Sequence, residues 1–447
     1  MMQEAKLLGP VAKSIWLVTT GEPLPIDGDG VRLLRHGLLA QMLSKTGWQV
    51  TWWTSAFDHT SKVHRSVALG EDGENGEVRE LSANYRLVLL PSAGYKRNVS
   101  LARFADHADI ARAFTQRAAL QAKPDVILCS YPTLDLCDAA SCYGQQHSVP
   151  VVLDIRDLWP DIFLHLVPGW LRPLARLVLW RSFGMSARSL KAATGIVGIT
   201  VPIRDWALRR AGRLAGPYDA VFPLACAQPT LAPIDKDKAD ARWDRLGATT
   251  DKFIVCFFGA LGRQFDFETV ITAAEICQTK NPAVLFVICG AGQRLAALQA
   301  ASARLTNLIV PGWIGQTDIW ALMARASCGL APYENEYSFT LSVPNKIIEY
   351  FSAGLPVVSC LRGETRQLIE SQGLGIQYAE RSSVALVNAL ERLAEDTSSR
   401  QAMARRAAAL FLQDFSAQKV YDHMTAYLAG IALTRCAPLT SAQHDAD

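Results

Sequence analysis

Short apolar runs alternate with amphipathic stretches along almost the whole chain. In the first half, the runs predict strands at Ser14–Thr20, Gln49–Ser55, Tyr85–Pro91, Asp125–Ser130, Val149–Ile155 and Thr194–Thr200. In the second half, they predict strands at Phe253–Gly259, Ala283–Gly290, Leu308–Trp313, Cys328–Tyr333, Leu355–Cys360 and Leu374–Ala379. Helices are predicted between them, among others at Val31–Lys45, Leu101–Ala119, Asp266–Gln278 and Ser383–Glu395. Strands that alternate with helices are typical of parallel sheets built from βαβ units. We therefore expect an α/β chain with two Rossmann-like domains.

A stretch rich in glycine and proline separates the two sets of elements, at Gly212–Pro229. It predicts an N-terminal domain over residues 1–215 and a C-terminal domain over residues 216–416. The last strong helical pattern, residues 417–430, follows the complete second domain, and residues 434–447 form a polar tail. In two doubly wound domains, ligands bind at the loops after the strands. Those loops are therefore where we look for chemistry.

Composition narrows the class of protein. The chain has 447 residues, of which 50% are hydrophobic and 19% charged, with a net charge of +3. This composition excludes a largely disordered or coiled-coil chain. The small net charge argues against a protein that binds nucleic acid over its whole surface.

Cysteine usage and hydropathy indicate the compartment. The chain has ten cysteines without a CxxC pair, and several lie inside apolar runs, as in Val255-Cys256-Phe257. Such cysteines behave as small buried hydrophobes, which favours a reducing compartment over a disulfide framework or zinc site. Ile15–Val18 is too short for a signal-peptide core, and we find no transmembrane run. We expect a cytoplasmic protein.

The loop after the first strand contains glycines that allow close backbone approach to a ligand. Gly28 and Gly30 precede a predicted helix. A loop that leads into a helix N-terminus is suited to bind a diphosphate or an acceptor substrate. Asp27-Gly28-Asp29 is also a DxD sequence, which holds a divalent metal in some enzymes. Acidic residues are common in glycine-rich turns, however, so we predict no metal site here.

Glycine-rich loops follow two strands of the second half. Gly259 and Gly262 precede Arg263, whose guanidinium has a geometry suited to phosphate oxygens, and Gly290 and Gly292 end the next strand. A solvated arginine is the simpler interpretation of Arg263. Trp313 follows another predicted strand, where an aromatic ring can bracket a base, although it can equally belong to the core.

The segment Ser342–Val358 is the most informative part of the chain. Its sequence predicts a short helix that starts near Pro344 and ends at Gly354. Lys346 and Glu349 are three residues apart, so they share one face of that helix. Glu349 can accept hydrogen bonds from two ribose hydroxyls, and Lys346 brings positive charge near phosphates. The alternative is a surface salt bridge worth about 0.5 kcal/mol.

This segment carries a family resemblance. Pro-Asn-Lys-x-x-Glu-Tyr-x-x-x-Gly-x-Pro-Val-Val, which includes Asn345, resembles the donor-site motif of family 4 glycosyltransferases of the GT-B fold. Val310-Pro311-Gly312-Trp313 and Ala331-Pro332-Tyr333 precede it in the family's order. The segments Gly21–Pro25, Val50–Ser55 and Asp154–Pro160 look like the subgroup that makes bacterial surface polysaccharides, such as O-antigen, capsule or exopolysaccharide.

The resemblance implies a fold and an activity. It implies a GT-B fold of two facing Rossmann-like domains with the active site in the interdomain cleft, and a final helix that returns to the N-terminal domain. The implied reaction is sugar transfer from a nucleotide-sugar donor with retention of configuration. The implied donor is a UDP-sugar, favoured as an N-acetylated hexosamine, and the implied acceptor is polyprenyl-diphosphate-linked or an oligosaccharide. No cofactor and no metal are implied.

Two positions depart from the family pattern. Leu341 stands where the family often has a second glutamate, eight positions before Glu349, so the contacts of that acid must come from elsewhere. The family also often has a histidine after the fourth strand, where this chain has Cys129-Ser130-Tyr131-Pro132. Asp157, Arg156 and His107 remain the candidate catalytic polar groups.

A basic and aromatic stretch follows the fifth strand. Six basic residues and no acidic residue lie between Asp161 and Asp205. A helical pattern there combines Trp170, Arg172, Arg176 and Trp180 with many leucines. Such composition suits an interfacial contact with the inner leaflet of a membrane, and a buried helix or a dimer contact is the alternative. We expect a cytoplasmic protein that is peripheral on the inner membrane.

Three functional hypotheses follow. The first is the glycosyltransferase described above. The second is a nucleotide-sugar 2-epimerase, which shares the two-domain fold and needs cleft acids and histidines for proton transfer. The third is a non-catalytic nucleotide-sugar-binding protein, which the two departures from the family pattern keep open.

Overall fold

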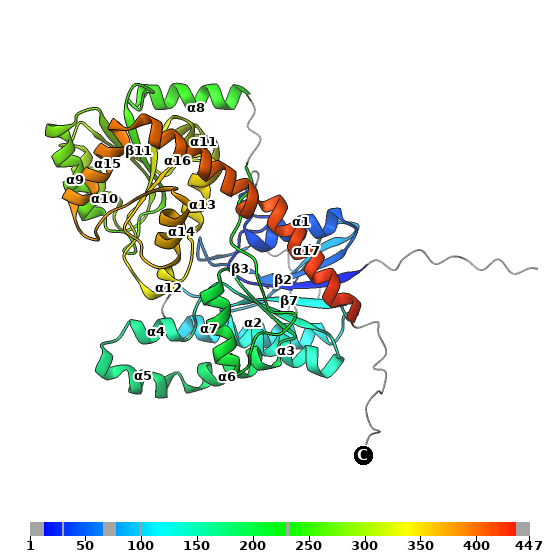
Figure 1. The fold of residues 1–447 in the computed structure, drawn as a ribbon. Helices are drawn as coiled ribbons and strands as arrows, with labels where there is room; N and C mark the ends of the chain where they lie inside the picture. The colour runs from blue at the N-terminus through cyan, green and yellow to red at the C-terminus, as the bar shows by residue number, and fades with distance from the viewer. Residues whose placement is uncertain (1–12, 29–30, 66–76, 99, 229–232, 435–447) are drawn as a thin grey trace, which may run out of the picture. The chain divides into compact units, whose positions relative to one another are not determined.

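A computed structural model of the chain describes residues 13–28, 31–65, 77–98, 100–228 and 233–434. The chain divides into two compact units (Figure 1). One contains residues 1–222 together with residues 421–447, and the other contains residues 223–420. The sequence predicted the boundary along the chain between residues 215 and 216, whereas the observed boundary lies between Phe222 and Pro223.

The N-terminal unit is built on an eight-stranded sheet in the order β10-β9-β8-β7-β1-β2-β6-β5. Its strands are β1 (Ser14–Val18), β2 (Gln49–Ser55), β5 (Glu77–Ser82), β6 (Tyr85–Leu90), β7 (Val126–Tyr131), β8 (Val151–Ile155), β9 (Gly195–Gly198) and β10 (Ala220–Val221). Only β5 pairs antiparallel within this sheet. Because β1 lies between β2 and β7, the winding direction reverses at β1, and ligands bind beside such reversals in doubly wound sheets.

Helices cover both faces of this sheet (Figure 1). They are α1 (Arg35–Lys45), α2 (Leu101–Ala118), α3 (Leu134–His147), α4 (Asp161–His165), η1 (Gly169–Leu171), α5 (Arg172–Val178), α6 (Trp180–Ala192), α7 (Val201–Ala211) and α17 (Ala417–Thr434). The tryptophan rings of Trp16 and Trp53 lie 5.0 Å apart, and Phe114 of α2 packs 5.2 Å from Trp53. Tyr427 of α17 donates to the Tyr218 carbonyl at 2.6 Å, which fixes the last helix to this unit.

The C-terminal unit contains a six-stranded parallel sheet in the order β13-β12-β11-β14-β15-β16. Its strands are β11 (Phe253–Ala260), β12 (Val284–Ala291), β13 (Leu308–Gly312), β14 (Cys328–Ala331), β15 (Val357–Ser359) and β16 (Gly375–Gln377). The winding reverses at β11, which pairs with both β12 and β14. The central strands β11 and β12 are apolar and buried except at their last residues, as expected for a parallel sheet covered on both faces.

The helices of this unit alternate with its strands. They are α8 (Pro233–Arg245), α9 (Phe267–Lys280), α10 (Leu295–Ser302), α11 (Gln316–Arg325), α12 (Tyr337–Thr340), α13 (Asn345–Ser352), α14 (Glu364–Gln372), α15 (Ser383–Glu395), α16 (Thr397–Leu410) and the π-helical turn η2 (Phe411–Phe415). The Asp266 side chain caps α9 by accepting the Thr269 N–H, and Ser382 caps α15 in the same way.

The predicted α/β class with two Rossmann-like units is confirmed, and each predicted strand is present. Three features were missed: the edge strand β5, the short strand β10 and the two-stranded hairpin β3 (Phe57–Asp58) with β4 (Val63–His64). Strand β5 alternates half-buried and exposed positions, so it has no apolar run to reveal it. The predicted start of the first helix at Val31 is wrong. That helix begins at Arg35, because Leu34 has an extended backbone and the Glu22 side chain accepts the N–H of His36.

None of the nine cysteines in the described part of the chain forms a disulfide, and only Cys142 among them is exposed. No described helix is long and apolar enough to cross a membrane.

Candidate functional site

Helix α13 lies over the point of the C-terminal sheet where the winding reverses. The Tyr350 hydroxyl lies 3.1 Å from the Cys256 carbonyl in β11 and 3.0 Å from the Leu330 carbonyl in β14. The tyrosine ring occupies the space that a Cβ on Gly329 would need, at 2.3 Å. Glycine in β14 therefore allows α13 to approach the sheet, and Tyr350 fixes it across both central strands.

Lys346 of α13 reaches the end of β11. Its ammonium donates to the Phe258 carbonyl and lies 4.0 Å from the centre of the Phe257 ring. The residue is 8% exposed, as is Glu349 one turn later. Both members of the predicted Lys346–Glu349 pair thus lie on the buried side of α13. This placement disfavours an ordinary surface salt bridge.

Glycines line the ends of the strands beside Lys346. Gly259 at the end of β11 pairs with Gly290 at the end of β12, and Gly312 ends β13 next to Cys289. A Cβ on Gly290 would lie 1.8 Å from the Gly259 carbonyl oxygen, and one on Gly259 would lie 2.8 Å from Lys346 Nζ. These glycines have a positive backbone angle φ, which residues other than glycine rarely adopt. The ends of these strands therefore form a bare glycine edge, where backbone without side chains lies next to the Lys346 ammonium.

The other predicted donor-site residues occupy loops of the same unit. Gly292, just past β12, would bring a Cβ within 2.6 Å of the Leu261 carbonyl oxygen, so it belongs to the same bare edge. Gly262 and the exposed Arg263 follow β11. Trp313 follows β13 and is 74% exposed, which argues against the core alternative. Asn345 is exposed at the first position of α13, and the half-buried Leu341 ends α12.

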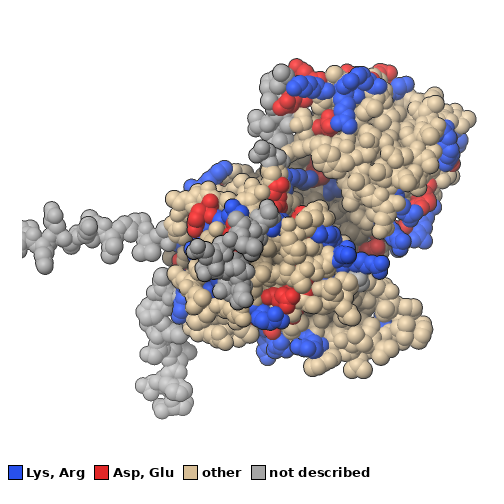
Figure 2. All heavy atoms as spheres, turned by 180° about the vertical axis from the view of Figure 1, so that it is seen from behind, with Lys and Arg blue, Asp and Glu red and all other residues tan. Residues whose placement is uncertain are grey.

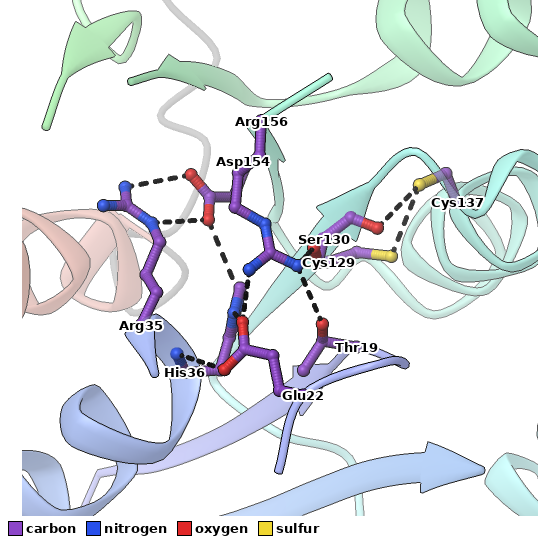
Figure 3. Close-up of polar contacts among 9 residues, drawn as sticks. All are labelled: Thr19, Glu22, Arg35, His36, Cys129, Ser130, Cys137, Asp154 and Arg156. Atoms are coloured by element: carbon purple, nitrogen blue, oxygen red, sulfur yellow. Dashed lines mark hydrogen bonds and ion pairs between the residues drawn. The ribbon is translucent and has the colours of Figure 1, made fainter. Parts of the chain in front are cut away.

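A buried charged network lies at the corresponding edge of the N-terminal unit (Figure 3). Glu22, in the loop after β1, lies 2.9 Å from His36 Nδ1 through its Oε1, and its Oε2 accepts the His36 backbone N–H at 2.9 Å. Arg156, just after β8, donates to the same carboxylate. Burial opposes ionisation of Glu22, but Arg156 and His36 outweigh it and hold the pKa of Glu22 well below its ordinary value.

Asp154 and Arg35 complete this network (Figure 3). Arg35 donates to both carboxylate oxygens of Asp154, at 2.8 and 3.0 Å, and Asp154 Oδ2 lies 3.6 Å from His36 Nε2. Burial works against the charge of Asp154, yet Arg35 and His36 keep its pKa low. His36 therefore links two carboxylates, each of which also has an arginine partner.

Arg156 is the most accessible member of the network. Its guanidinium donates to Ser130 Oγ of β7 at 2.6 Å, and 20% of its side chain is exposed. It thus stands at the ends of β1, β7 and β8, where the N-terminal sheet reverses its winding. A guanidinium held at such an edge can bind a phosphate or hydroxyl group, whereas Glu22, His36 and Asp154 are too buried to exchange protons with a ligand.

The other predicted catalytic groups, Asp157 and His107, both interact electrostatically with Arg103. Asp157 accepts the Leu158 N–H at 2.7 Å, and burial raises its pKa. His107 of α2 is buried, with its ring 5.6 Å from that of Trp159, and burial lowers its pKa to about 3. A histidine so held is neutral at pH 7 and packs as an aromatic residue, which favours a structural role for His107.

The glycine loop after β1 is described only in part. Gly28 has positive φ with open space around it, while Asp29 and Gly30 lie outside the described residues. Asp27 binds Arg65 through both oxygens, at 2.6 and 2.8 Å, and also accepts the Leu24 N–H. Both Asp27 oxygens are thus occupied by contacts with Arg65 and with the backbone of the loop. The predicted tail is likewise outside the described residues from residue 435 onward.

Sequence reasoning missed Glu22, His36, Asp154 and Arg35 as one cluster. The signal was present, because Glu22 and Asp154 lie within the two segments Gly21–Pro25 and Asp154–Pro160 that carried the family resemblance. Their partnership joins positions more than one hundred residues apart. Only the order of the strands brings them together.

Comparisons with known proteins agree with the fold. Residues 252–396 match the family model described as glycosyl transferases group 1. No curated protein sequence matches the chain. Among solved structures, sucrose-phosphate synthase from Thermosynechococcus elongatus is 17% identical, with a TM-score of 0.68 over 94% of this chain and 100% of that chain. HepE from Anabaena, in complex with UDP and glucose, is 16% identical, with a TM-score of 0.63 over the same shares.

A third similar structure is WaaG, a glycosyltransferase involved in lipopolysaccharide biosynthesis. It is 15% identical, with a TM-score of 0.61 over 93% of this chain and 100% of that chain. The C-terminal unit therefore carries a glycosyl transferases group 1 domain, and the chain has the GT-B fold. At that level the resemblance drawn from the sequence is confirmed. The polysaccharide subgroup stays a prediction.

Proposed function

We propose that the chain is a glycosyltransferase that takes a sugar from a UDP-sugar bound at the strand ends of its C-terminal unit. One observation carries the proposal: within the matched family domain, α13 brings Lys346 to the bare glycine edge where the sheet reverses its winding, and Glu349 lies on the same buried side of that helix. Ligands of doubly wound sheets bind at such reversals. The UDP complex of the similar HepE structure supports uridine as the base.

In this proposal each group has one task. The Glu349 carboxylate accepts hydrogen bonds from the ribose hydroxyls. Lys346 and Arg263 neutralise the diphosphate, and the backbone at Gly259, Gly262, Gly290 and Gly292 allows it to approach. Trp313 covers the base, and backbone groups near Leu341 and Asn345 contact the sugar. When the acceptor hydroxyl attacks the anomeric carbon, the bond between that carbon and the diphosphate oxygen breaks. The nucleoside diphosphate leaves with its charge stabilised, and one of its phosphate oxygens takes the proton of the acceptor hydroxyl.

The finer parts of the proposal rest on the resemblance of the sequence to family 4 glycosyltransferases. The transferred sugar is an N-acetylated hexosamine, transfer retains the anomeric configuration, and the reaction needs no metal ion. The acceptor is a polyprenyl-diphosphate-linked or free saccharide in surface polysaccharide synthesis, and the protein works at the cytoplasmic side of the inner membrane. Arg156 and Asp157 are the proposed polar groups of the N-terminal unit.

The test is donor turnover by purified protein with UDP-N-acetylglucosamine, UDP-glucose and GDP-mannose, with and without a lipid extract as acceptor. Hydrogen bonds to a charged group contribute about 1.5–3 kcal/mol, so Glu349→Ala should weaken donor binding about 10- to 100-fold. Lys346→Met should also lose most turnover. Glu395→Ala and Lys280→Ala, at exposed positions of α15 and α9, serve as matched controls.

Product analysis separates the alternatives. A glycosyltransferase releases UDP and glycosylates the acceptor. An epimerised sugar nucleotide formed without acceptor would instead support the 2-epimerase, and donor binding without any turnover would support a binding protein. Turnover that survives Glu349→Ala unchanged would contradict the proposed donor site.

A further inference from the structure

The segment between α4 and α6 exposes an unusual number of large apolar side chains. From Leu166 to Trp180 the only polar side chains are Arg172 and Arg176. Six of the apolar side chains are more than half exposed: Leu166, Trp170, Leu174, Leu177, Val178 and Trp180. Helices α4, η1 and α5 contain no buried residue at all. These helices therefore contribute little to the core of their own unit.

An open groove runs along one side of α5. It has a volume of about 540 Å³ and lies between α5, the beginning of α2 and the segment after α4. Its lining includes Leu101, Phe104, Phe163, Leu171, Leu174 and Val178, and Ser100 is the only lining residue with a polar side chain. The positions 171, 174, 175 and 178 repeat at helical spacing, so one whole face of α5 is turned to the groove.

The charged side chains of α5 and of the start of α6 have one sign. Arg172 and Arg176 lie one turn apart on α5, beside the groove-lining face, and both are exposed, as is Arg181 at the start of α6. No acidic residue occurs between Asp161 and Asp205. Seen from behind, the corner of the molecule formed by α4 and α5 is almost entirely uncharged surface without acidic residues (Figure 2).

The exposed apolar side chains and the arginines together indicate which kind of partner can bind to this surface. Exposed apolar patches of this kind mark sites of protein or membrane contact. A second copy of the chain, packed face to face, would bring the arginines of α5 against one another without a compensating acid. An anionic bilayer accepts both features: its headgroups pair with arginine, and its interface accommodates tryptophan and leucine side chains.

We propose that α4, η1, α5 and the start of α6 form a docking face for an anionic lipid bilayer. Helix α5 lies in the interface with Arg172 and Arg176 at the headgroup phosphates and Trp170 and Trp180 at the boundary with the acyl chains. A lipid hydrocarbon chain occupies the groove. This proposal does not rest on the donor site, because docking needs neither nucleotide nor sugar.

The experiment is flotation of the full chain with vesicles of phosphatidylcholine alone or with 30% phosphatidylglycerol, in the absence of nucleotide. We expect at least tenfold more binding to the anionic vesicles, and less at high salt because salt screens the arginines. Arg172→Glu/Arg176→Glu and Trp170→Ser/Trp180→Ser should each lower binding at least fivefold. Arg405→Glu and Leu214→Ser, which are exposed outside this face, should not.

A second measurement reports on the groove itself. In a Cys142→Ser/Cys436→Ser background, Ala175→Cys is labelled with a polarity-sensitive dye, and Arg405→Cys is the control position. We expect the emission of the dye at position 175 to shift to the blue with anionic vesicles and the control to stay unchanged. No binding to anionic vesicles, or binding unaffected by both double variants, would overturn the proposal. A concentration-dependent dimer that those variants abolish would instead assign the face to a second copy.

Discussion

At the scale of single residues, the most demanding feature is the set of charges buried beneath the strand ends of the N-terminal unit. Glu22 and Asp154 are fully buried, and a buried charge is tolerated only when it is paired and hydrogen-bonded. Arg156 and Arg35 supply the pairing, and His36 lies 2.9 Å from the Glu22 carboxylate and 3.6 Å from that of Asp154. The network therefore holds Arg156 in one orientation at the sheet edge.

Glu22→Gln should destabilise the chain by on the order of 3 kcal/mol at pH 7, because it removes one partner of a buried ion pair. The folded-state pKa of Glu22 is lower than the ordinary value of 4.5, so its contribution is fully present above pH 4.5 and is lost as the pH falls toward the folded pKa. The difference between wild type and variant in urea unfolding should therefore be constant from pH 7 to 5 and shrink below 4.5. Asp109→Asn, at a surface ion pair, should change stability by less than about 1 kcal/mol. A difference that grows on acidification would contradict this account of Glu22.

Gly290 offers a second test at this scale. Gly290→Ala would place a methyl group 1.8 Å from the Gly259 carbonyl oxygen at a positive φ, so it should lower the free energy of unfolding by at least about 1–3 kcal/mol. Gly315→Ala, where no atom lies within 4 Å of the added carbon and φ is negative, should cost at most about 1 kcal/mol. Equal thermal stability of the two variants would show that the strand ends are not packed this tightly.

At the scale of elements, α13 is the part of the C-terminal unit that joins fold to proposed function. Tyr350 holds α13 to both central strands, while Lys346 lies in the first turn of the helix and Glu349 in the second. Tyr350→Phe should cost about 1–3 kcal/mol, because two buried carbonyl oxygens lose the donor they share. It should also weaken UDP binding less than Glu349→Ala does, since Tyr350 acts only by holding the helix. Calorimetric titration of both variants checks this order, and a reversed order would make Tyr350 the ligand contact.

The elements also show what sequence can predict. The buried strands of both sheets were predictable because each contains a short apolar run, and α13 was predictable from Pro344, Gly354 and the spacing of Lys346 and Glu349. Strand β5 was not, because its residues alternate in burial and gain their place only by pairing with β6. The Glu22–Asp154 network was not, because its members meet through strand order. The start of α1 was misplaced for the same reason, since the carboxylate that caps it belongs to the loop after β1.

At the scale of the whole molecule, the chain consists of two Rossmann-like units, of which the second carries the glycosyl transferases group 1 domain. The two sheets share a design. Each reverses its winding at a central strand, and at each reversal a cationic side chain is held against the strand ends: Arg156 in the N-terminal unit and Lys346 in the C-terminal unit. The N-terminal unit adds the apolar face around α5, which the donor site does not require.

The most direct test of the central claim is a thermal-shift titration with UDP, GDP, ADP and dTDP, with and without EDTA, on wild type and Glu349→Ala. A ligand that binds only the folded protein raises its unfolding temperature as its concentration passes the dissociation constant. We predict a shift that is specific for UDP, insensitive to EDTA and lost in Glu349→Ala, with each shift measured from the unfolding temperature of the same protein without ligand. No shift with any nucleotide, or an equal shift in Glu349→Ala, would contradict a UDP-sugar site on α13.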